Sequence, residues 1–347
     1  MRRALALALA LATSLLGVGL VATAASAPAT ATAGDFTFFV VPPSETDGGR
    51  TAVDVAAGPD GNVWFLATSE QGEDDVIGRV TPEGVIDTFA LDGSARGQLV
   101  TGPDGRLWVA SDRLYKVRPD GTVTPKGKPW RSAATALVEG PRNRLWLLTG
   151  DKVKKLDAGG RPLRTYRMPH LGPDLAARPD GRLWIARREG VDRLAPAGTV
   201  TTFPSPGAST ANPENFEGIT VGPDGKLWVA SNYVTDIFTL RNFAEVCKLS
   251  VQGRYRCFPG PSGVHVLAAG ADGNVHVDGH AVHHVGGSVD PPTVRAYAPN
   301  GTTSDHTADA LTDVTALTGG PDGHLWFTQS PDEQGRTIGR LEVAPTG

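Results

Sequence analysis

The sequence is poor in several features that would point to a function. Only two of its 347 residues are cysteines, which excludes a small scaffold held together by many disulfides. Positive charge is not in excess, because 33 lysines and arginines stand against 37 aspartates and glutamates. The net charge of −4 gives no electrostatic case for a nucleic-acid partner.

Beyond the N-terminus the chain also lacks long apolar runs and helical periodicity. No later run is long enough to cross a bilayer, so membrane insertion is not expected. Apolar residues do not recur at the three- and four-residue steps that mark one face of a helix. The sequence therefore predicts an all-β protein.

Residues 1–25 have the features of a secretory signal peptide. A basic start at Arg2 and Arg3 precedes an apolar run that ends in small residues. Residues 26–35, rich in alanine, threonine and proline, are expected to form a flexible leader. No cysteine near the cut offers a lipid anchor. The mature protein is therefore expected to be secreted, with a net charge of −6 once the two arginines are removed.

The most informative feature is a tight turn followed by a short apolar strand that contains a tryptophan. The last copy runs from Gly320 to Phe327 and reads Gly-Pro-Asp-Gly-His-Leu-Trp-Phe. The tryptophan position recurs at spacings of 38 to 50 residues, and a histidine occupies it once. The marker residues are Trp64, Trp108, Trp146, Trp184, Trp228, His276 and Trp326.

Seven repeats of this length predict a β-propeller. Each repeat has the size of one four-stranded blade, with glycine and proline at the joints and β-branched residues in the runs. We therefore expect residues 36–347 to form a single seven-bladed propeller domain. The last repeat ends near Leu341, one strand short, and residues 36–42 resemble the missing strand. The N-terminal strand is expected to complete the seventh blade and close the ring.

The two cysteines lie on either side of a predicted hairpin turn. Cys247 and Cys257 are equally distant from Gln252, which places them opposite each other on paired strands. In an oxidising compartment this arrangement predicts a disulfide.

Strand direction predicts which face of the propeller binds a ligand. The tight turns share one face, whereas the longer and irregular connections share the other, around the mouth of the central channel. Acidic residues on these longer loops could form a patch for a cation or a cationic ligand, or only a solvated surface. The candidate residues of this long-loop face are Glu70, Asp74, Asp75, Gln329, Asp332 and Glu333.

The sixth repeat carries an unusual run of polar residues at alternate positions. His276, Asp278 and His280 would share one strand face, and imidazole with carboxylate can hold a transition metal. The alternative is a structural polar cluster, because His276 occupies the position of a buried tryptophan. The three residues are candidates only, and no metal site is assigned.

Two further residues could bring acid–base chemistry to the channel mouth. Glu217 and His265 each come just before the innermost strand of their repeats, which are neighbours in the ring. A carboxylate close to an imidazole suits proton transfer near neutral pH. The alternative is a hydrogen bond that only fastens the rim. At the same place the other repeats have Val53, Gly97, Thr135, Pro173 and Thr315.

The repeat resembles that of the virginiamycin B lyases. The resemblance rests on the segment from Gly320 to Gln329 followed by Thr-Ile-Gly-Arg-Leu at 337–341, and on the first repeat with Val-Ile-Gly-Arg-Val at 76–80. It covers the chain from about Phe36 to Leu341. It implies a seven-bladed propeller that opens the ester of a cyclic depsipeptide antibiotic by elimination, with a magnesium ion.

The resemblance also implies positions for the catalytic groups. The family's histidine lies in a Pro-His-Gly-Ile segment before an inner strand, and His265 occupies that place within Gly-Val-His-Val. The family's acid closes a Trp-Phe-Thr-Glu strand, where this chain has Gln329. A base and an electrophile are both needed to remove a proton beside a carbonyl.

Three functions are compatible with the sequence. The first is a secreted propeller, expected to be monomeric, that binds a small molecule, a peptide or a glycan on its long-loop face without the full lyase set. The second is a magnesium-dependent lyase that uses His265 together with Glu217. The third is a metal-dependent lactone hydrolase. No cofactor is assigned apart from the magnesium of the lyase alternative.

Overall fold

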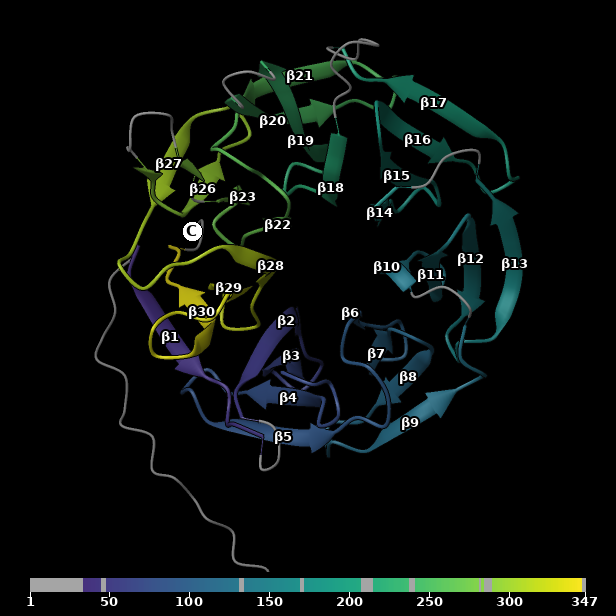
Figure 1. Cartoon of the computed structure of the whole chain (residues 1–347). Coiled ribbons are helices and arrows are strands. Elements are labelled where there is room, and N and C mark those ends of the chain that lie inside the picture. The colour runs from purple at the N-terminus through teal and green to yellow at the C-terminus, as the bar shows by residue number, and fades with distance from the viewer. Residues whose placement is uncertain are drawn as a thin grey trace, which may run out of the picture.

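The computed structural model describes residues 34–44, 48–130, 134–168, 172–206, 215–236, 241–280, 282–283 and 289–344. Their strands form seven four-stranded antiparallel sheets arranged in a ring around a central channel, with one additional two-stranded hairpin (Figure 1). No helix occurs in these ranges. The predicted seven-bladed propeller is therefore confirmed. The predicted signal peptide, residues 1–25, and most of the leader lie outside the described residues.

Each blade is a meander whose first strand lines the channel and whose last strand lies at the rim. The first blade comprises β2 (Arg50–Ala57), β3 (Val63–Ser69), β4 (Val76–Val80) and β5 (Ile86–Ala90), and the second comprises β6 (Gln98–Thr101), β7 (Leu107–Ala110), β8 (Leu114–Val117) and β9 (Val123–Lys126). The third blade comprises β10 (Ala134–Gly140), β11 (Arg144–Thr149), β12 (Lys152–Asp157) and β13 (Pro162–Arg167), and the fourth comprises β14 (Asp174–Ala177), β15 (Leu183–Arg187), β16 (Gly190–Leu194) and β17 (Val200–Pro204). Blades five to seven comprise β18 (Asn215–Val221), β19 (Leu227–Asp236), β20 (Arg241–Leu249) and β21 (Tyr255–Pro259); β22 (Leu267–Ala269), β23 (Val275–Gly279), β26 (Thr293–Tyr297) and β27 (Thr303–His306), with the hairpin β24 (Val282–His283) and β25 (Val289–Asp290); β28 (Val314–Gly319), β29 (Leu325–Gln329), β30 (Arg336–Leu341) and β1 (Phe36–Val40).

Three residues of the repeated turn have distinct structural roles in the first blade. A Cβ atom on Gly58 would lie 2.3 Å from Cδ1 of Trp64, so only glycine leaves room for the indole ring. The carboxylate of Asp60 accepts a hydrogen bond from Trp64 Nε1 at 3.0 Å. Gly61 has a φ of 79°, a left-handed conformation that glycine adopts without strain. The motif therefore encodes a turn that holds its own tryptophan.

The Ile-Gly-Arg segment fits against the same strand. Gly78 faces Phe65, and a Cβ atom there would lie 2.0 Å from the end of the phenyl ring. The guanidinium of Arg79 lies 5.7 Å from the centroid of the Trp64 ring, a cation–π contact. Gly78 therefore makes room for Phe65 on one face of the sheet, and Arg79 packs over Trp64 on the other.

The sixth blade keeps this arrangement with a histidine. His276 is completely buried, and its Nε2 lies 3.1 Å from both carboxylate oxygens of Asp272. The residue paired with it on the next strand is Ala296 rather than a cation. His276 therefore replaces the tryptophan in packing and in hydrogen bonding.

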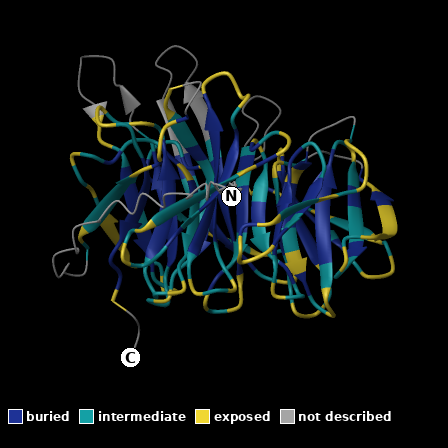
Figure 2. Ribbon diagram, turned by 90° about the horizontal axis from the view of Figure 1, so that it is seen from below, coloured by how far each residue is buried: buried dark blue, intermediate teal, exposed yellow. Residues whose placement is uncertain are grey.

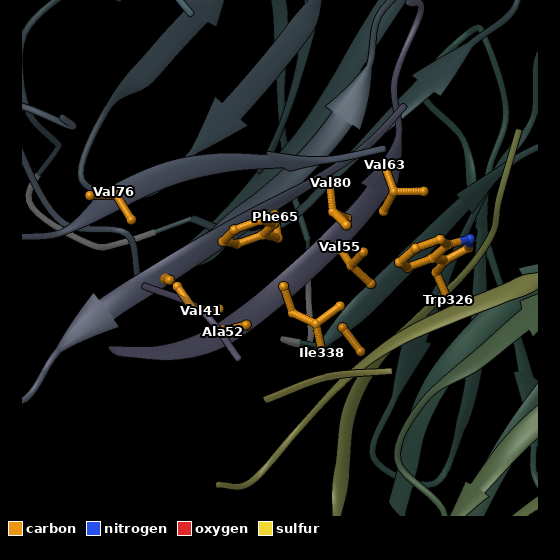
Figure 3. Close-up of a cluster of buried hydrophobic side chains, with 11 residues drawn as sticks. Val41, Ala52, Val55, Val63, Phe65, Val76, Val80, Trp326 and Ile338 are labelled. Carbon is orange, nitrogen blue, oxygen red and sulfur yellow. The ribbon is translucent and has the colours of Figure 1, made fainter. Parts of the chain in front are cut away.

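The N-terminal strand closes the ring, as the sequence predicted. β1 pairs antiparallel with β30, with Phe36 opposite Leu341. Phe39 stacks on Trp326 at a centroid distance of 5.4 Å. Side chains of the first and seventh blades then meet in one apolar cluster (Figure 3). Buried residues fill the strands in the middle of the propeller, and many exposed residues lie in the turns and loops at its two faces (Figure 2).

The predicted disulfide is also confirmed. Cys247 on β20 and Cys257 on β21 are directly paired in the strand register and are bonded to each other. Among the described residues, no helix is long and apolar enough to cross a membrane.

Candidate functional site

Bulges shape the ends of the inner strands on the long-loop face. In four inner strands the register skips one residue, which the bulge displaces from the ladder. The skipped residues are Val53, Thr135, Glu217 and Thr315. A bulge re-aims a side chain near the end of a strand, and Glu217, which lies within β18 rather than just before it, is displaced in this way.

The sixth blade gathers two imidazoles and one carboxylate on this face. His265 precedes β22, Asp278 lies within β23, and His280 follows β23. His265 Nδ1 lies 3.2 Å from His280 Nε2 and 3.6 Å from Asp278 Oδ2. His280 Nε2 lies 2.8 Å from the same Oδ2 atom. We call these three residues the blade-six cluster.

Asp278 is the buried member of the cluster. Its side chain is completely buried, and Oδ1 accepts hydrogen bonds from the main-chain amides of His265 and Val266, both at 2.8 Å. Burial favours the neutral acid, but the two amide hydrogen bonds and the two imidazoles beside the carboxylate keep the pKa of Asp278 below its ordinary value. Asp278 is therefore an anion beneath two imidazoles.

His265 is the accessible member of the cluster. Its side chain is 46% exposed, compared with 27% for His280. The adjacent Asp278 carboxylate raises the pKa of His265 against partial burial, and the charge of Glu217 acts in the same direction. The structure thus places Glu217 within electrostatic reach of His265. The main chains also meet there, since a Cβ atom on Gly218 would lie 2.8 Å from the His265 carbonyl oxygen.

The structure separates His276 from Asp278 and His280, with which strand alternation had grouped it. His276 lies toward the tight-turn end of β23 and bonds to Asp272, away from Asp278 and His280. His265, from the preceding loop, completes the cluster in its place. Strand alternation could not find His265, because the residue reaches Asp278 across the sheet from another segment.

The acidic loops are largely committed to internal bonds. Asp75 is buried and accepts main-chain hydrogen bonds from Ser69 at 3.1 Å and Ala95 at 2.6 Å. Asp74 pairs with Arg50 at 2.5 Å.

In the seventh blade Asp332 pairs with Arg336 at 2.6 Å. Of the acidic candidates, Glu70 and Glu333 are exposed. Most of the expected patch therefore fastens loops.

Gln329 does not reach the surface of the long-loop face. Its side chain is completely buried, and Nε2 donates to the carbonyls of Ala310 at 3.1 Å and Arg336 at 3.2 Å. Its Oε1 accepts from the amide of Thr312 at 3.2 Å. Both ends of the amide are thus used to hold the loop before β28.

The channel is a separate feature of about 520 Å³, lined by the inner strands. Asp54 and Asp174 bond across blades, their Oδ2 atoms accepting from the amides of Leu99 at 2.5 Å and Ile219 at 2.9 Å. Burial raises the pKa of Asp54 to about 7 and that of Asp174 to about 6. Sequence patterns gave no indication of either carboxylate, since each occupies an ordinary inner-strand position.

Asp54 predicts a pH dependence of stability. Its pKa is about 7 in the folded state against an ordinary value of 3.8, so the folded state binds more protons between these values. The free energy of unfolding should therefore fall as pH rises from 4 to 7, by less than about 1.4 kcal/mol per pH unit because the side chain is partly exposed to the channel. In Asp54→Asn, which keeps an acceptor but cannot ionise, this fall should become smaller. Urea unfolding at several pH values measures it, and an unchanged slope would contradict the prediction.

Comparisons with known proteins agree with this architecture. The model of the virginiamycin B lyase family matches residues 27–235. Catalytically inactive virginiamycin B lyase from Staphylococcus aureus, solved with quinupristin, superposes with a TM-score of 0.66 at 19% identity, covering 89% of this chain and all of that one. The extracellular domain of a protein described as a hybrid two-component system from B. thetaiotaomicron gives a TM-score of 0.61 at 12% identity, covering 91% of this chain and 44% of that one. No curated protein matches the chain in sequence.

Proposed function

The chain belongs to the virginiamycin B lyase family, and on that premise we propose that it is a secreted propeller that binds a ligand without performing the lyase reaction. The ligand would be a small molecule, a peptide or a glycan on the long-loop face over blades five and six. The disulfide between Cys247 and Cys257 supports an extracellular location, because such bonds persist in oxidising compartments.

The main support for this proposal is the chemical nature and burial of Gln329. The family resemblance puts a carboxylate at this position, where an acid would face the substrate. Here the side chain is a neutral amide, completely buried, with both of its polar atoms bonded to main-chain groups. An amide in this environment can neither transfer a proton nor supply charge, so the lyase set lacks its acid.

Magnesium, the cofactor that the resemblance implies, does not fit the residues on this face. Magnesium prefers an octahedral shell of carboxylate, carbonyl and water oxygens. Among the described residues, no metal-compatible group of side chains consists of oxygen donors alone. The group on the long-loop face supplies one carboxylate oxygen and two imidazole nitrogens.

The exposed groups instead suit recognition of a polar ligand. His265 presents an exposed imidazole, with Glu217 near it in the neighbouring blade. A ligand placed over both blades could therefore contact an imidazole and a carboxylate. The rigid strands below would hold both groups in fixed positions.

A streptogramin B depsipeptide, together with panels of peptides and glycans, tests this function. We expect at least one probe to raise the unfolding temperature of the mature protein, and His265→Ala to weaken its binding by about tenfold or more. His324→Ala is the matched control, because it removes an imidazole paired with Glu342 at 2.7 Å on the tight-turn face. If no probe binds in a His265-dependent way, the proposal is wrong.

The same experiment separates binding from catalysis. Elimination opens the depsipeptide ring without changing its mass, whereas hydrolysis adds one water, so chromatography with mass spectrometry distinguishes the two reactions. The proposal expects the intact ring. Ring opening at unchanged mass, lost in His265→Ala, would establish the lyase instead.

One observation favours the lyase as the second candidate. His265 is accessible and is oriented by the buried anion Asp278, the arrangement of a histidine that acts as a general base. The lactone hydrolase gains no comparable support from the channel. There Asp54 and Asp174 accept main-chain hydrogen bonds from the neighbouring blade.

A further inference from the structure

We propose that His265, Asp278 and His280 bind one transition-metal dication of the zinc type on the long-loop face of blade six. The proposal does not rest on the proposed ligand-binding function, since the metal could be structural or could form part of a ligand site. It differs from the magnesium that the family resemblance implies, because two of the three donors are imidazole nitrogens.

The donor atoms have the spacing that such an ion needs. His265 Nδ1 lies 3.2 Å from His280 Nε2 and 3.6 Å from Asp278 Oδ2. The third distance, from His280 Nε2 to Asp278 Oδ2, is 2.8 Å. Bonds of about 2.0–2.1 Å in a tetrahedral shell place neighbouring donors about 3.3 Å apart. An ion above this triangle could therefore contact all three atoms with only small shifts of the side chains.

A buried oxygen of Asp278 gives independent support for a cation-binding site. Its Oδ1 atom is occupied by two main-chain amides, which fix the orientation of the carboxylate. Its Oδ2 atom is buried, points at both imidazoles and accepts no hydrogen bond of good geometry. A buried carboxylate oxygen without such a bond is costly unless a positive group faces it. A metal ion would satisfy this atom and both ring nitrogens together.

A second layer supports one of the ligands. The other ring nitrogen of His280, Nδ1, lies 3.8 Å from Asp313 Oδ1. Metal-binding histidines commonly direct their second nitrogen to a carboxylate, which orients the ring and increases its basicity. Asp313 comes from the loop before β28, so the seventh blade would steady a site built by the sixth.

The site is open on its outer side. His265 is 46% exposed and His280 is 27% exposed, whereas Asp278 is enclosed. Three protein ligands with solvent access leave a fourth position for water or for a donor atom of a ligand. Two nitrogens and one oxygen favour zinc, cobalt, nickel or copper over magnesium and calcium.

Metal titration of the untagged mature protein tests the proposal. After treatment with a chelator, we expect the protein to bind one Zn²⁺ or Co²⁺ in competition with a chromophoric chelator. The cobalt form should show the intense visible absorption of a four-coordinate ion, a signature that a purely structural polar cluster would not produce. Magnesium at the same concentration should not compete.

Single substitutions assign the ligands. His265→Ala and His280→Ala should each weaken zinc binding at least tenfold and remove the cobalt spectrum. His324→Ala should leave both unchanged, because that residue is on the opposite face. Asp278→Asn is a further variant, and its fold is checked by circular dichroism because the side chain is buried.

Two outcomes would overturn the metal site. One is the absence of zinc or cobalt binding by the unsubstituted protein. The other is binding that persists unchanged in the double variant of His265 and His280, which would place the ion elsewhere. Either result would leave the ligand-binding test with peptides, glycans and depsipeptide unaffected, so the two proposals can fail separately.

Discussion

A chain that begins at residue 42 should not form a cooperatively folded propeller, whereas one that begins at residue 34 should. The deletion removes β1 and leaves the seventh blade with three strands. It also removes Phe36 and Phe38, which pack edge-on against Phe327, and Phe39, which stacks on Trp326. These three partly buried rings contribute on the order of 5 kcal/mol, a large part of the 5–15 kcal/mol that stabilises an ordinary domain.

Urea unfolding followed by tryptophan fluorescence measures this effect. A synthetic peptide of residues 34–41 should partly restore the transition when added to the shortened chain, because β30 would again have its partner. A shortened chain with the same unfolding midpoint as the longer one would show that β1 does not stabilise the ring.

Trp228→Ala should lower the free energy of unfolding by about 3–5 kcal/mol. Trp228 is 1% exposed and packs beside Phe258 at a centroid distance of 6.0 Å. The substitution leaves a cavity between blades five and six, deprives Asp224 of the indole hydrogen bond at 3.3 Å, and removes the ring beneath Lys248. The effect is measured by urea unfolding at constant pH.

Trp130→Ala is the matched control for this prediction. Trp130 is a tryptophan of the same size that lies partly exposed outside the repeated position, with Lys154 5.2 Å from its ring centroid. Its removal should destabilise the protein by less than half as much, because less apolar surface returns to water. Equal losses for the two variants would mean that the repeated tryptophans have no special role.

The fold was predictable because most of the repeats carry the same local packing and hydrogen-bonding requirements. The spacing of the tryptophans predicted the number of blades, and the structure explains why glycine and aspartate recur near most of the tryptophans. Gly58 and Gly78 leave room for aromatic rings, and Asp60 bonds to the indole. Such requirements act within one blade, so a single sequence reveals them as a pattern.

The candidate site was less predictable because its members come from different segments. Strand alternation correctly grouped Asp278 with His280 but added His276, whose ring belongs to the buried tryptophan position. The loops raised a related difficulty. Asp75 looked available in the sequence, yet its carboxylate is fully used by main-chain amides. Charge in a loop does not show whether the loop needs that charge for its own shape.

The closure of the ring has a consequence for the order of folding. Phe36 and Leu341 are separated by almost the whole chain, so the first strand to be synthesised must wait for the last before it can pair. Closing a loop of roughly three hundred residues is slow and entropically unfavourable compared with forming a local hairpin. We therefore expect six blades to form early and the seventh to complete late, in a slow phase that the shortened chain cannot show.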